Sequence, residues 1–203
     1  MIYLVRHGET EWNRAGRMQG QLDSPLTARG EAQALRIGET LCELLDGVDF
    51  EMVASPLGRT RATAAIIARA LDRDPEAMTT DERLMEMTWG DWDGLSRAEI
   101  EARDPDAWAR RKADRWNYPP PGGGESYAMV ARRVGDWLAS LGPDRSLIVV
   151  CHGGAGRVVR GLYGGLTEAE TLAQEEPQDA FHLLRDGLIG RIDTEVSGGP
   201  GRR

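Results

Sequence analysis

Two apolar runs of strand type each end in a histidine followed by a glycine. One opens the chain as Ile2-Tyr3-Leu4-Val5-Arg6-His7-Gly8, and the other lies late in it as Leu147-Ile148-Val149-Val150-Cys151-His152-Gly153. The chain has only three histidines, so two of them share this context. Parallel strands of an open α/β sheet present ligand-binding groups where the strands end. The pattern therefore predicts an α/β sheet with His7 and His152 in a functional site.

The length of 203 residues fits one domain with a substantial core. We predict a single domain over residues 1–196 and a flexible C-terminal tail over residues 197–203. No apolar run approaches the length that crosses a bilayer, and the first residues lack the charged and apolar regions of a signal peptide. We therefore expect a cytoplasmic protein without a membrane partner.

The chain has 33 acidic and 25 basic residues and a formal net charge of −8. This balance argues against nucleic acid as a partner, and it requires any phosphate site to be made by local cations. All the basic residues except Lys112 are arginines, whose planar guanidinium groups bind carboxylates and phosphates through paired hydrogen bonds. The two cysteines, Cys42 and Cys151, are too few for a disulfide framework or a zinc site, and we expect both to be reduced and buried.

Strand and helix patterns alternate along the chain. A helix is predicted from its cap, Thr27, to Leu45, with Leu35, Leu41, Cys42 and Leu45 on one face. Further helices are predicted from the cap Ser55 and first-turn residue Pro56 to Leu71, from Ser96 to the residue before Asp104, around Trp108, from Ser126 to Leu141, after His152 through Leu162, and from Thr167. Strands are predicted at 52–54, 77–80, 181–184 and 188–192, the last two as a hairpin. The expected fold is a three-layer α/β/α sandwich with a mostly parallel central sheet.

Several polar groups follow strands that would lie side by side in this sheet. Arg6-His7, the segment from Ser55 to Arg59, and His152-Gly153 are expected at the same edge. Guanidinium groups and helix N-terminal amides bind phosphoryl oxygens, and a neutral imidazole can attack phosphorus. The sequence therefore indicates a phosphoryl-transfer site.

Such a reaction also needs an acid, because a leaving alkoxide must be protonated. Glu86 is the best-placed carboxyl group, and Glu82 and Glu9 stay open as alternatives. A metal site made by His7, Glu9, His152 and Glu86 is conceivable, but two neighbouring arginines would repel a dication. We therefore expect no metal.

The same residues form an ordered series of motifs. Arg6-His7-Gly8-Glu9-Thr10 follows the first strand. The later motifs are Glu11-Trp12-Asn13, Arg17-Met18-Gln19-Gly20, Asp23-Ser24-Pro25-Leu26-Thr27, Ser55-Pro56-Leu57-Gly58-Arg59-Thr60, Leu84-Met85-Glu86, Gly123-Gly124-Glu125-Ser126 and Cys151-His152-Gly153. In this order, over almost the whole chain, they resemble the phosphoglycerate mutase-like branch of the histidine phosphatase superfamily. The resemblance implies a phosphoglycerate mutase-like fold.

The resemblance also implies roles for these residues. His7 would be the nucleophile that becomes phosphohistidine, and Glu86 would act as general acid and then as general base. The residues that would hold the phosphoryl group or the rest of the substrate are Arg6, Arg59, His152, Asn13, Gln19, Gly20 and Gly153. We expect nearby arginines to lower the pKa of His7, and a backbone carbonyl to fix its tautomer. No cofactor is expected.

Two groups of residues have simpler interpretations. His182 lies in an apolar strand pattern and is expected to pack or to make one hydrogen bond. Trp89, Trp92, Trp108 and Trp116 crowd the segment after Glu86, where packing is the default and a substrate-facing lid is the alternative. We expect this segment to set specificity.

The motifs do not separate hydrolysis from phosphoryl return to the substrate. Mutases that resemble this chain carry an arginine pair before a proline run, which grips the substrate carboxylate. Arg110-Arg111 precedes Pro119-Pro120-Pro121 here, but the intervening residues depart from the mutase pattern. We therefore favour a metal-independent phosphatase over a cofactor-dependent phosphoglycerate mutase.

The partner is expected to be a small phosphorylated metabolite, such as a sugar phosphate, a phosphoglycerate derivative or ribazole phosphate. A non-catalytic phosphate-binding regulator is an alternative of another class, against which the intact His7, His152 and Glu86 argue. A homodimer, through the tryptophan-rich segment or the terminal hairpin, stays open.

Overall fold

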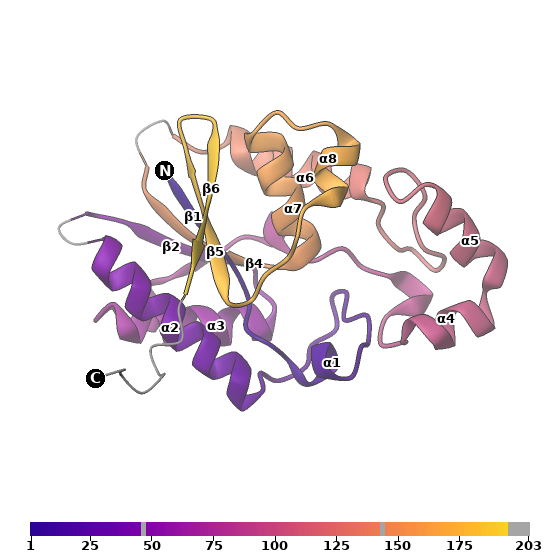
Figure 1. Cartoon of the computed structure of the whole chain (residues 1–203), viewed down its shortest axis with the longest axis horizontal. Coiled ribbons are helices and arrows are strands. Elements are labelled where there is room, and N and C mark those ends of the chain that lie inside the picture. The colour runs from indigo at the N-terminus through magenta and orange to yellow at the C-terminus, as the bar shows by residue number, and fades with distance from the viewer. Residues whose placement is uncertain (46–47, 143–144, 195–203) are drawn as a thin grey trace, which may run out of the picture.

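The centre of the molecule is a six-stranded sheet, seen in a computed structural model that describes residues 1–45, 48–142 and 145–194 (Figure 1). The strands are β1 (Ile2–Arg6), β2 (Glu51–Ala54), β3 (Thr79–Thr80), β4 (Leu147–Cys151), β5 (Ala180–Arg185) and β6 (Leu188–Asp193). Their order is β3-β2-β4-β1-β5-β6. The strands β3, β2, β4 and β1 run parallel to one another. β5 and β6 form the predicted antiparallel hairpin, and β5 pairs antiparallel with β1. The predicted α/β class with a mostly parallel sheet is confirmed.

Helices connect the strands and cover both faces of the sheet. They are α1 (Glu11–Arg14), α2 (Ala28–Leu44), α3 (Gly58–Ala70), α4 (Arg97–Arg103), α5 (Pro105–Ala113), α6 (Tyr127–Ala139), α7 (Gly153–Tyr163) and α8 (Glu168–Ala173). Three short 3₁₀ turns are η1 (Pro75–Ala77), η2 (Glu82–Leu84) and η3 (Gly90–Trp92). No helix in the described ranges is long and apolar enough to span a bilayer.

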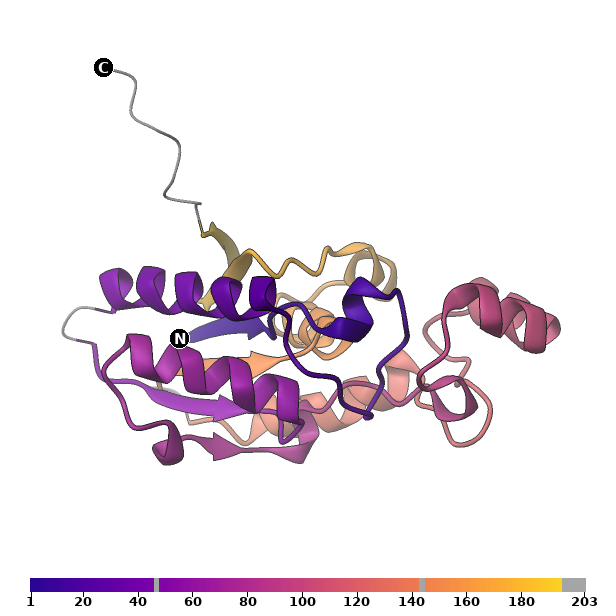
Figure 2. The same ribbon diagram turned by 90° about the horizontal axis from the view of Figure 1, so that it is seen from below.

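The alternation of side chains along each strand makes two separate cores. In β1, Tyr3 and Val5 face α2 and α3, where they pack with Ile37 and Ile67. The other residues of the strand, such as Leu4, face α6 and α7. In Figure 2, α2 and α3 lie on the face of the sheet toward the viewer, and α7 lies behind the sheet. Because both faces are covered at the centre of the sheet, β1 and β4 are almost entirely apolar, as in other parallel sheets.

The strand register places the two His-Gly sequences side by side. β1 and β4 are parallel neighbours, with Arg6 opposite Cys151. The His7 amide donates to the Cys151 carbonyl oxygen at 3.0 Å, one residue beyond the last strand pair. His7 and His152 therefore leave the sheet together, as the sequence predicts.

The first long helix begins at its predicted cap but buries a different face. Thr27 caps α2, and its hydroxyl accepts a hydrogen bond from the Gly30 amide. The prediction was wrong for Leu35, which is 46% exposed, and for Cys42, which is also exposed. Each of these follows a buried residue by one position, and one position turns the side chain about 100° around the helix axis. Cys151, by contrast, is buried as predicted.

The helix after β2 starts later than predicted. Ser55 does not cap it; α3 begins at Gly58, after Leu57, which makes no side-chain cap. The Ser55 hydroxyl instead pairs with the His152 ring across the sheet edge. A serine before proline therefore serves the site here rather than the helix.

A small lobe lies between β3 and α6 in the chain. It contains η3, α4 and α5, which extend away from the sheet on the side where its parallel strands end (Figures 1 and 2). Its own core consists of Trp92, Ile100 and Ala107, with Trp108 packed edge-on against Trp92. The predicted tail, residues 197–203, lies outside the described residues, and the single-domain boundary at 196 stays a prediction.

Candidate active site

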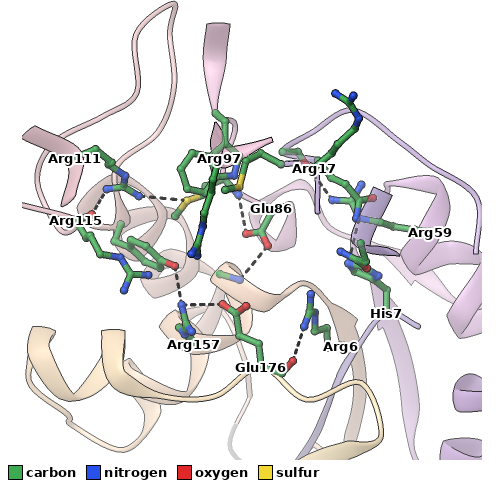
Figure 3. Close-up of a pocket in the computed structure, with 18 of the residues that line it drawn as sticks. Arg6, His7, Arg17, Arg59, Glu86, Arg97, Arg111, Arg115, Arg157 and Glu176 are labelled. Carbon is green, nitrogen blue, oxygen red and sulfur yellow. Dashed lines mark hydrogen bonds and ion pairs between the residues drawn. The ribbon is translucent and has the colours of Figure 1, made fainter. Parts of the chain in front are cut away.

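The carboxyl ends of β1, β2 and β4 open onto one cavity of about 450 Å³. Figure 3 shows how the side chains that line it point toward one another. Of the predicted site residues, Arg6, His7, Asn13, Gln19, Gly20, Arg59 and Glu86 line it. We call Arg6, His7, Arg59, Glu86 and His152 the inner site, because they surround the end of the sheet.

The His7 ring is held in one tautomer by two hydrogen bonds. Its Nδ1 lies 2.8 Å from the Gly8 carbonyl oxygen, which can only accept. On the other side, Arg59 Nε donates to His7 Nε2 at 3.3 Å. Nδ1 therefore carries the proton and Nε2 keeps its lone pair.

Burial also keeps His7 uncharged. The residue is 3% exposed, and burial, followed by the charges of Arg6 and Arg59, holds its pKa well below the usual histidine value. Burial is the larger cause, whereas the sequence alone pointed to the arginines. A neutral, oriented imidazole is the form that can act as a nucleophile.

The glycine after His7 allows a close approach of two backbones. A Cβ atom on Gly8 would lie 2.2 Å from the Gly30 carbonyl oxygen, in the first turn of α2. No side chain fits there without moving α2. The Gly8 amide also donates to Thr63 Oγ1 of α3 at 3.1 Å. The His-Gly sequence is therefore fixed between two helices.

Arg59 is buried and is tied to the loop that follows α1. Its Nη1 donates to the Leu22 carbonyl oxygen and its Nη2 to that of Gly20, both at 2.8 Å. Asp23 forms an ion pair with Nη1 at 3.3 Å. With both ends of the guanidinium engaged, the Nε edge is directed at His7. The loop thus orients the cation that faces the nucleophile.

His152 lies beside His7 but does not line the main cavity. The two rings meet edge to face, with centroids 5.3 Å apart. His152 Nε2 lies 2.8 Å from Ser55 Oγ, and within the described residues its buried Nδ1 has no hydrogen-bond partner. Burial, then Arg59 and His7, lower its pKa well below the usual value. Gly153 lies with His152 around a small adjacent pocket rather than on the cavity wall.

Glu86 is the predicted acid that reaches the cavity. Its two carboxylate oxygens accept hydrogen bonds from the Gly154 amide at 3.0 Å and the Ala155 amide at 3.1 Å. These amides form the N-terminus of α7, which favours an anionic group. Glu82 is exposed in η2, and Glu9 accepts a hydrogen bond from Thr27 at 2.9 Å. Neither alternative lines the cavity.

An ion pair clasps the loop that carries Glu86. Arg133 of α6 donates to the carbonyl oxygens of Arg83 at 2.8 Å and Met85 at 2.7 Å. The same guanidinium binds both oxygens of Glu125, each at 3.0 Å. Glu125 also accepts from the Thr88 amide at 3.3 Å, on the other side of Glu86. The Gly-Gly-Glu-Ser motif therefore contributes to the site by holding this loop.

The predicted substrate-binding residues of the first loop are also in place. Asn13 closes a capping box with Thr10 at the start of α1, and Gln19 donates to Thr10 Oγ1 at 2.7 Å. Gly20 has a φ of +53°, and a Cβ there would strike the Asp93 carboxylate at 1.7 Å. This backbone conformation favours glycine, and it directs the Gly20 carbonyl at Arg59.

A segment before β5 supports the site without any motif that could reveal it. The Glu176 carbonyl oxygen accepts a hydrogen bond from Arg6 Nη1. Gln178 Nε2 donates to the His7 carbonyl oxygen at 3.1 Å and to Asn13 Oδ1 at 3.0 Å. These contacts join residues about 165 to 171 positions apart in the chain. Sequence reasoning missed them because nothing local marks the residues as functional.

The far side of the cavity, which we call the outer wall, comes from the small lobe and its flanking loops. It consists of Trp89, Arg97, Trp108, Arg111, Lys112 and Arg115. Trp92 is fully buried, and Trp116 stacks on Tyr127 with centroids 6.2 Å apart. Packing is therefore correct for these two tryptophans, while Trp89 and Trp108 face the cavity. His182 makes one hydrogen bond, with Arg160 Nη1 at 2.8 Å, as expected.

No group of three or more histidine, cysteine, aspartate or glutamate side chains that could hold a metal ion occurs in the part of the chain that the structure describes. The cations of Arg6 and Arg59 lie where a phosphoryl group would need positive charge.

Comparisons with known proteins point the same way as the geometry. The probable phosphoglycerate mutase GpmB of Salmonella paratyphi B is 38% identical over 202 residues, covering 97% of this chain and 86% of that protein. Among solved structures, the "putative alpha-ribazole-5'-P phosphatase" of Escherichia coli has a TM-score of 0.79 at 26% identity, over 96% of this chain and 95% of that one. The mycobacterial glucosyl-3-phosphoglycerate phosphatase, in complex with VO3, has a TM-score of 0.73 at 31% identity, over 89% and 90%.

The family match covers most of the molecule. Residues 2–178 match the histidine phosphatase superfamily (branch 1), from the first strand to the segment that supports Arg6 and His7. The fold, the paired histidines at the sheet edge and this match agree. The chain therefore belongs to branch 1 of the histidine phosphatase superfamily.

Proposed function

We propose that the protein is a metal-independent phosphatase that hydrolyses a small phosphomonoester through a phosphohistidine on His7. The observation that carries this proposal is the fixed neutral tautomer of His7 in a cavity that also holds Arg6, Arg59 and Glu86. Arginines supply the positive charge that a metal ion gives in other phosphatases. The proposal therefore needs no dication.

In the first half-reaction, the lone pair on His7 Nε2 forms a bond to phosphorus as the ester P–O bond breaks. Arg6 and Arg59 bind the phosphoryl oxygens and oppose the negative charge that spreads over them. The buried Nε of Arg6 and Nδ1 of His152 have no partner among the described residues. We assign both to phosphoryl oxygens, with His152 reaching them from beside His7 rather than from the cavity wall. The leaving oxygen takes its proton from the Glu86 carboxyl group.

In the second half-reaction, Glu86 is a carboxylate and removes a proton from water. The water oxygen attacks phosphorus, the N–P bond breaks, and the electron pair returns to His7 Nε2. The amides of Gly154 and Ala155 stabilise the carboxylate form that this step needs. One carboxyl group thereby serves both steps.

The runner-up is a cofactor-dependent phosphoglycerate mutase, the activity that the name of the Salmonella relative suggests. Against it, the arginine pair expected to grip a carboxylate is divided, because Arg111 lines the cavity and Arg110 does not. Arg110 is exposed and stacks on Tyr118, and Arg111 is 2% exposed and donates to the carbonyl oxygens of Arg115 and Tyr118. This arrangement favours hydrolysis. The same intact His7 and Glu86 speak against a non-catalytic phosphate binder.

The test is phosphate release in EDTA from a panel of phosphomonoesters, with wild type and His7→Ala side by side. Release by the wild type that is lost in the variant supports the phosphatase. A mutase would instead convert 3-phosphoglycerate to 2-phosphoglycerate after priming with 2,3-bisphosphoglycerate, without net phosphate release. Phosphate binding with neither activity would leave the non-catalytic binder.

A further inference from the structure

One buried arginine lies outside the main cavity and is not paired with a carboxylate in the part of the chain that the structure describes. Arg160 of α7 is 4% exposed. Its guanidinium donates to neutral acceptors instead: the Gly156 carbonyl oxygen at 3.3 Å, His182 Nε2 at 2.8 Å and the Glu175 carbonyl oxygen at 2.6 Å. Burying a charge costs free energy, and an apolar side chain of similar size is often at least as stabilising. Packing alone therefore does not explain an arginine at this position.

The Glu175 carbonyl belongs to the segment that supports the inner site. We call residues 174–178 the strap; they lie between α8 and β5. The Glu176 carbonyl oxygen accepts a hydrogen bond from Arg6, as the dashed line in Figure 3 marks. Gln178 donates to the His7 carbonyl oxygen at 3.1 Å. The strap thus contacts both the nucleophile and the arginine beside it.

Three successive carbonyl oxygens of the strap each accept a hydrogen bond from an arginine. Arg157 Nε donates to the Gln174 carbonyl oxygen at 2.7 Å. The next carbonyl oxygen binds Arg160, and the third binds Arg6. Arg157 and Arg160 are three residues apart on α7, so they face the same side of the helix. Residues 174–177 are neither helix nor strand, and side chains of α7 therefore fix where the third carbonyl lies.

Arg160 lies directly behind the inner site. A small pocket of about 20 Å³ is lined by Arg6, His152, Arg160 and His182. That space is enough for about one water molecule. Arg160 does not line the main cavity, so it cannot touch a substrate there. Any effect on the reaction must pass through the residues around it.

The contact with the strap sets the direction of Arg6. Its Nη1 is engaged by the Glu176 carbonyl oxygen, while its buried Nε has no partner among the described residues. Arg59 is oriented in the same manner, because carbonyl oxygens of the Gly20 loop engage its Nη atoms and leave Nε directed at His7. In both arginines, backbone carbonyls occupy one end of the guanidinium and direct the other.

We propose that Arg160 is a positioning residue for phosphoryl transfer: it fixes the strap, and the strap orients Arg6 toward the phosphoryl oxygens. His182 assists from β5, because an arginine can only donate and the histidine Nε2 must accept. The inference rests on the proposed function in one respect, the binding of phosphoryl oxygens by Arg6. It adds a residue outside the cavity on which that binding depends.

Replacing Arg160 by lysine tests the proposal. One ammonium group cannot bind the Glu175 carbonyl and His182 with the fixed geometry of a guanidinium. We expect Arg160→Lys to lower kcat/KM about tenfold or more, since small displacements of a binding group are costly in a transition state. Urea unfolding checks that the variant is folded under the assay conditions.

Two control variants separate positioning from lost stability and from altered charge. Val158→Ala removes fully buried apolar atoms from the same helix without removing a hydrogen bond to the strap. Arg191→Gln removes an arginine that pairs with the Glu175 carboxylate, on the exposed side of the strap, rather than with its carbonyl. Both should leave kcat/KM within about twofold of the wild type.

A double-mutant cycle with Arg6→Ala shows whether Arg160 acts through Arg6. Residues that act through one another give non-additive effects. In the Arg6→Ala background, Arg160→Lys should lower kcat/KM by less than about twofold, because the group that it positions is absent. A loss of equal size in both backgrounds would reduce Arg160 to general structural support and overturn the proposal.

Variants of His182 give the same test if Arg160→Lys does not fold. His182→Leu leaves Arg160 Nη1 without its acceptor, whereas the amide oxygen of His182→Gln can replace it. We expect His182→Leu to lower kcat/KM several-fold, only when Arg6 is present, and His182→Gln to restore most of the activity. Equal activities of the leucine and glutamine variants would contradict the proposal.

Binding of orthovanadate keeps this inference separate from the proposed function. Vanadate adopts the geometry of a phosphoryl group in transfer, and its dissociation constant can be titrated in all four proteins of the cycle without turnover. A non-additive cycle in vanadate affinity, with no phosphate release from any ester, would remove the phosphatase and leave the role of Arg160 intact. Phosphate release with an additive cycle, or with Arg160→Lys as active as the wild type, would remove the role of Arg160 and leave the phosphatase.

Discussion

The inner site and the outer wall face each other across one cavity, but they are built differently. The inner site comes from strand ends and helix termini, and His7, Arg59 and His152 are each at most 3% exposed. The outer wall comes from a small lobe, and its cations Arg97 and Arg115 are exposed. Rigid packing suits a nucleophile that must hold one tautomer. Exposed side chains on a small lobe suit the recognition of the part of a substrate beyond its phosphoryl group.

From this difference we predict that separate parts of the molecule carry chemistry and substrate specificity. A change in the inner site should affect every substrate alike, whereas a change in the outer wall should alter the ratio between substrates.

Replacing the nucleophile should have the largest effect. We expect His7→Ala to lower kcat by about 10⁴-fold or more for every substrate, because no other group can form the covalent intermediate. Acid quenching after a short reaction with ³²P-labelled substrate should trap label on the wild type and none on the variant. Labelled His7→Ala would place the nucleophile elsewhere, with His152 as the next residue to replace.

The loss of activity on replacing Glu86, the proposed acid, should depend on the leaving group. We expect Glu86→Gln to lower kcat/KM, which reports the phosphorylation step, by about 10³-fold for alkyl phosphates and much less for 4-nitrophenyl phosphate, whose leaving group needs no proton. Glu82→Gln is the matched control, since Glu82 is exposed outside the cavity. Equal losses for both substrates would remove Glu86 from the role of acid.

Acid should destabilise the protein through His182, which is buried and bonded to Arg160. His182 has an ordinary pKa of 6.5 when unfolded, but burial and then the charge of Arg160 lower its pKa to about 4 in the folded protein. Between these values the unfolded chain binds more protons, so the free energy of unfolding decreases as the pH falls from 6.5 to 4. The whole shift corresponds to about 3 kcal/mol.

Urea unfolding at pH 7 and pH 4.5 measures this loss. His182→Gln, which can still accept a hydrogen bond from Arg160, should lose less stability on acidification than the wild type. His7 and His152 also have lowered pKa values and contribute to the slope in both proteins, so the difference between them isolates His182. Identical losses would contradict the assignment.

Weakening the ion pair between Arg133 and Glu125, which holds the loop that carries Glu86, should give the smallest effect. We expect Arg133→Lys to lower kcat about tenfold with little change in KM, because a lysine cannot bind both loop carbonyls and the Glu125 carboxylate together. The loss in kcat/KM should be smaller for 4-nitrophenyl phosphate than for alkyl phosphates, as for Glu86→Gln. A rise in KM without a leaving-group effect would show that Arg133 supports the outer wall instead.

Much of the fold and the centre of the site could be predicted because the signals are local. Apolar runs and caps mark strands and helices, and parallel strands must end at one edge, which brings His7 and His152 together. The same local logic failed at Ser55, where a capping pattern competed with a hydrogen bond to His152 from a neighbouring strand. It also failed at Leu35 and Cys42, because the pattern did not settle which stripe of the helix would be buried.

The amino-acid sequence was enough to predict a histidine at each of two strand ends, Arg6 beside the first of them, Arg59 near the start of a later helix, and an acid among Glu86, Glu82 and Glu9. The fold was needed to show which of these glutamates lines the cavity, that residues 176–178 support Arg6 and His7, and that Arg97 and Arg115, but not Arg110, line the cavity. The reason is the separation in sequence of the residues that interact. Periodicity and caps act within a few turns, whereas these choices depend on hydrogen bonds and packing between segments far apart in the chain.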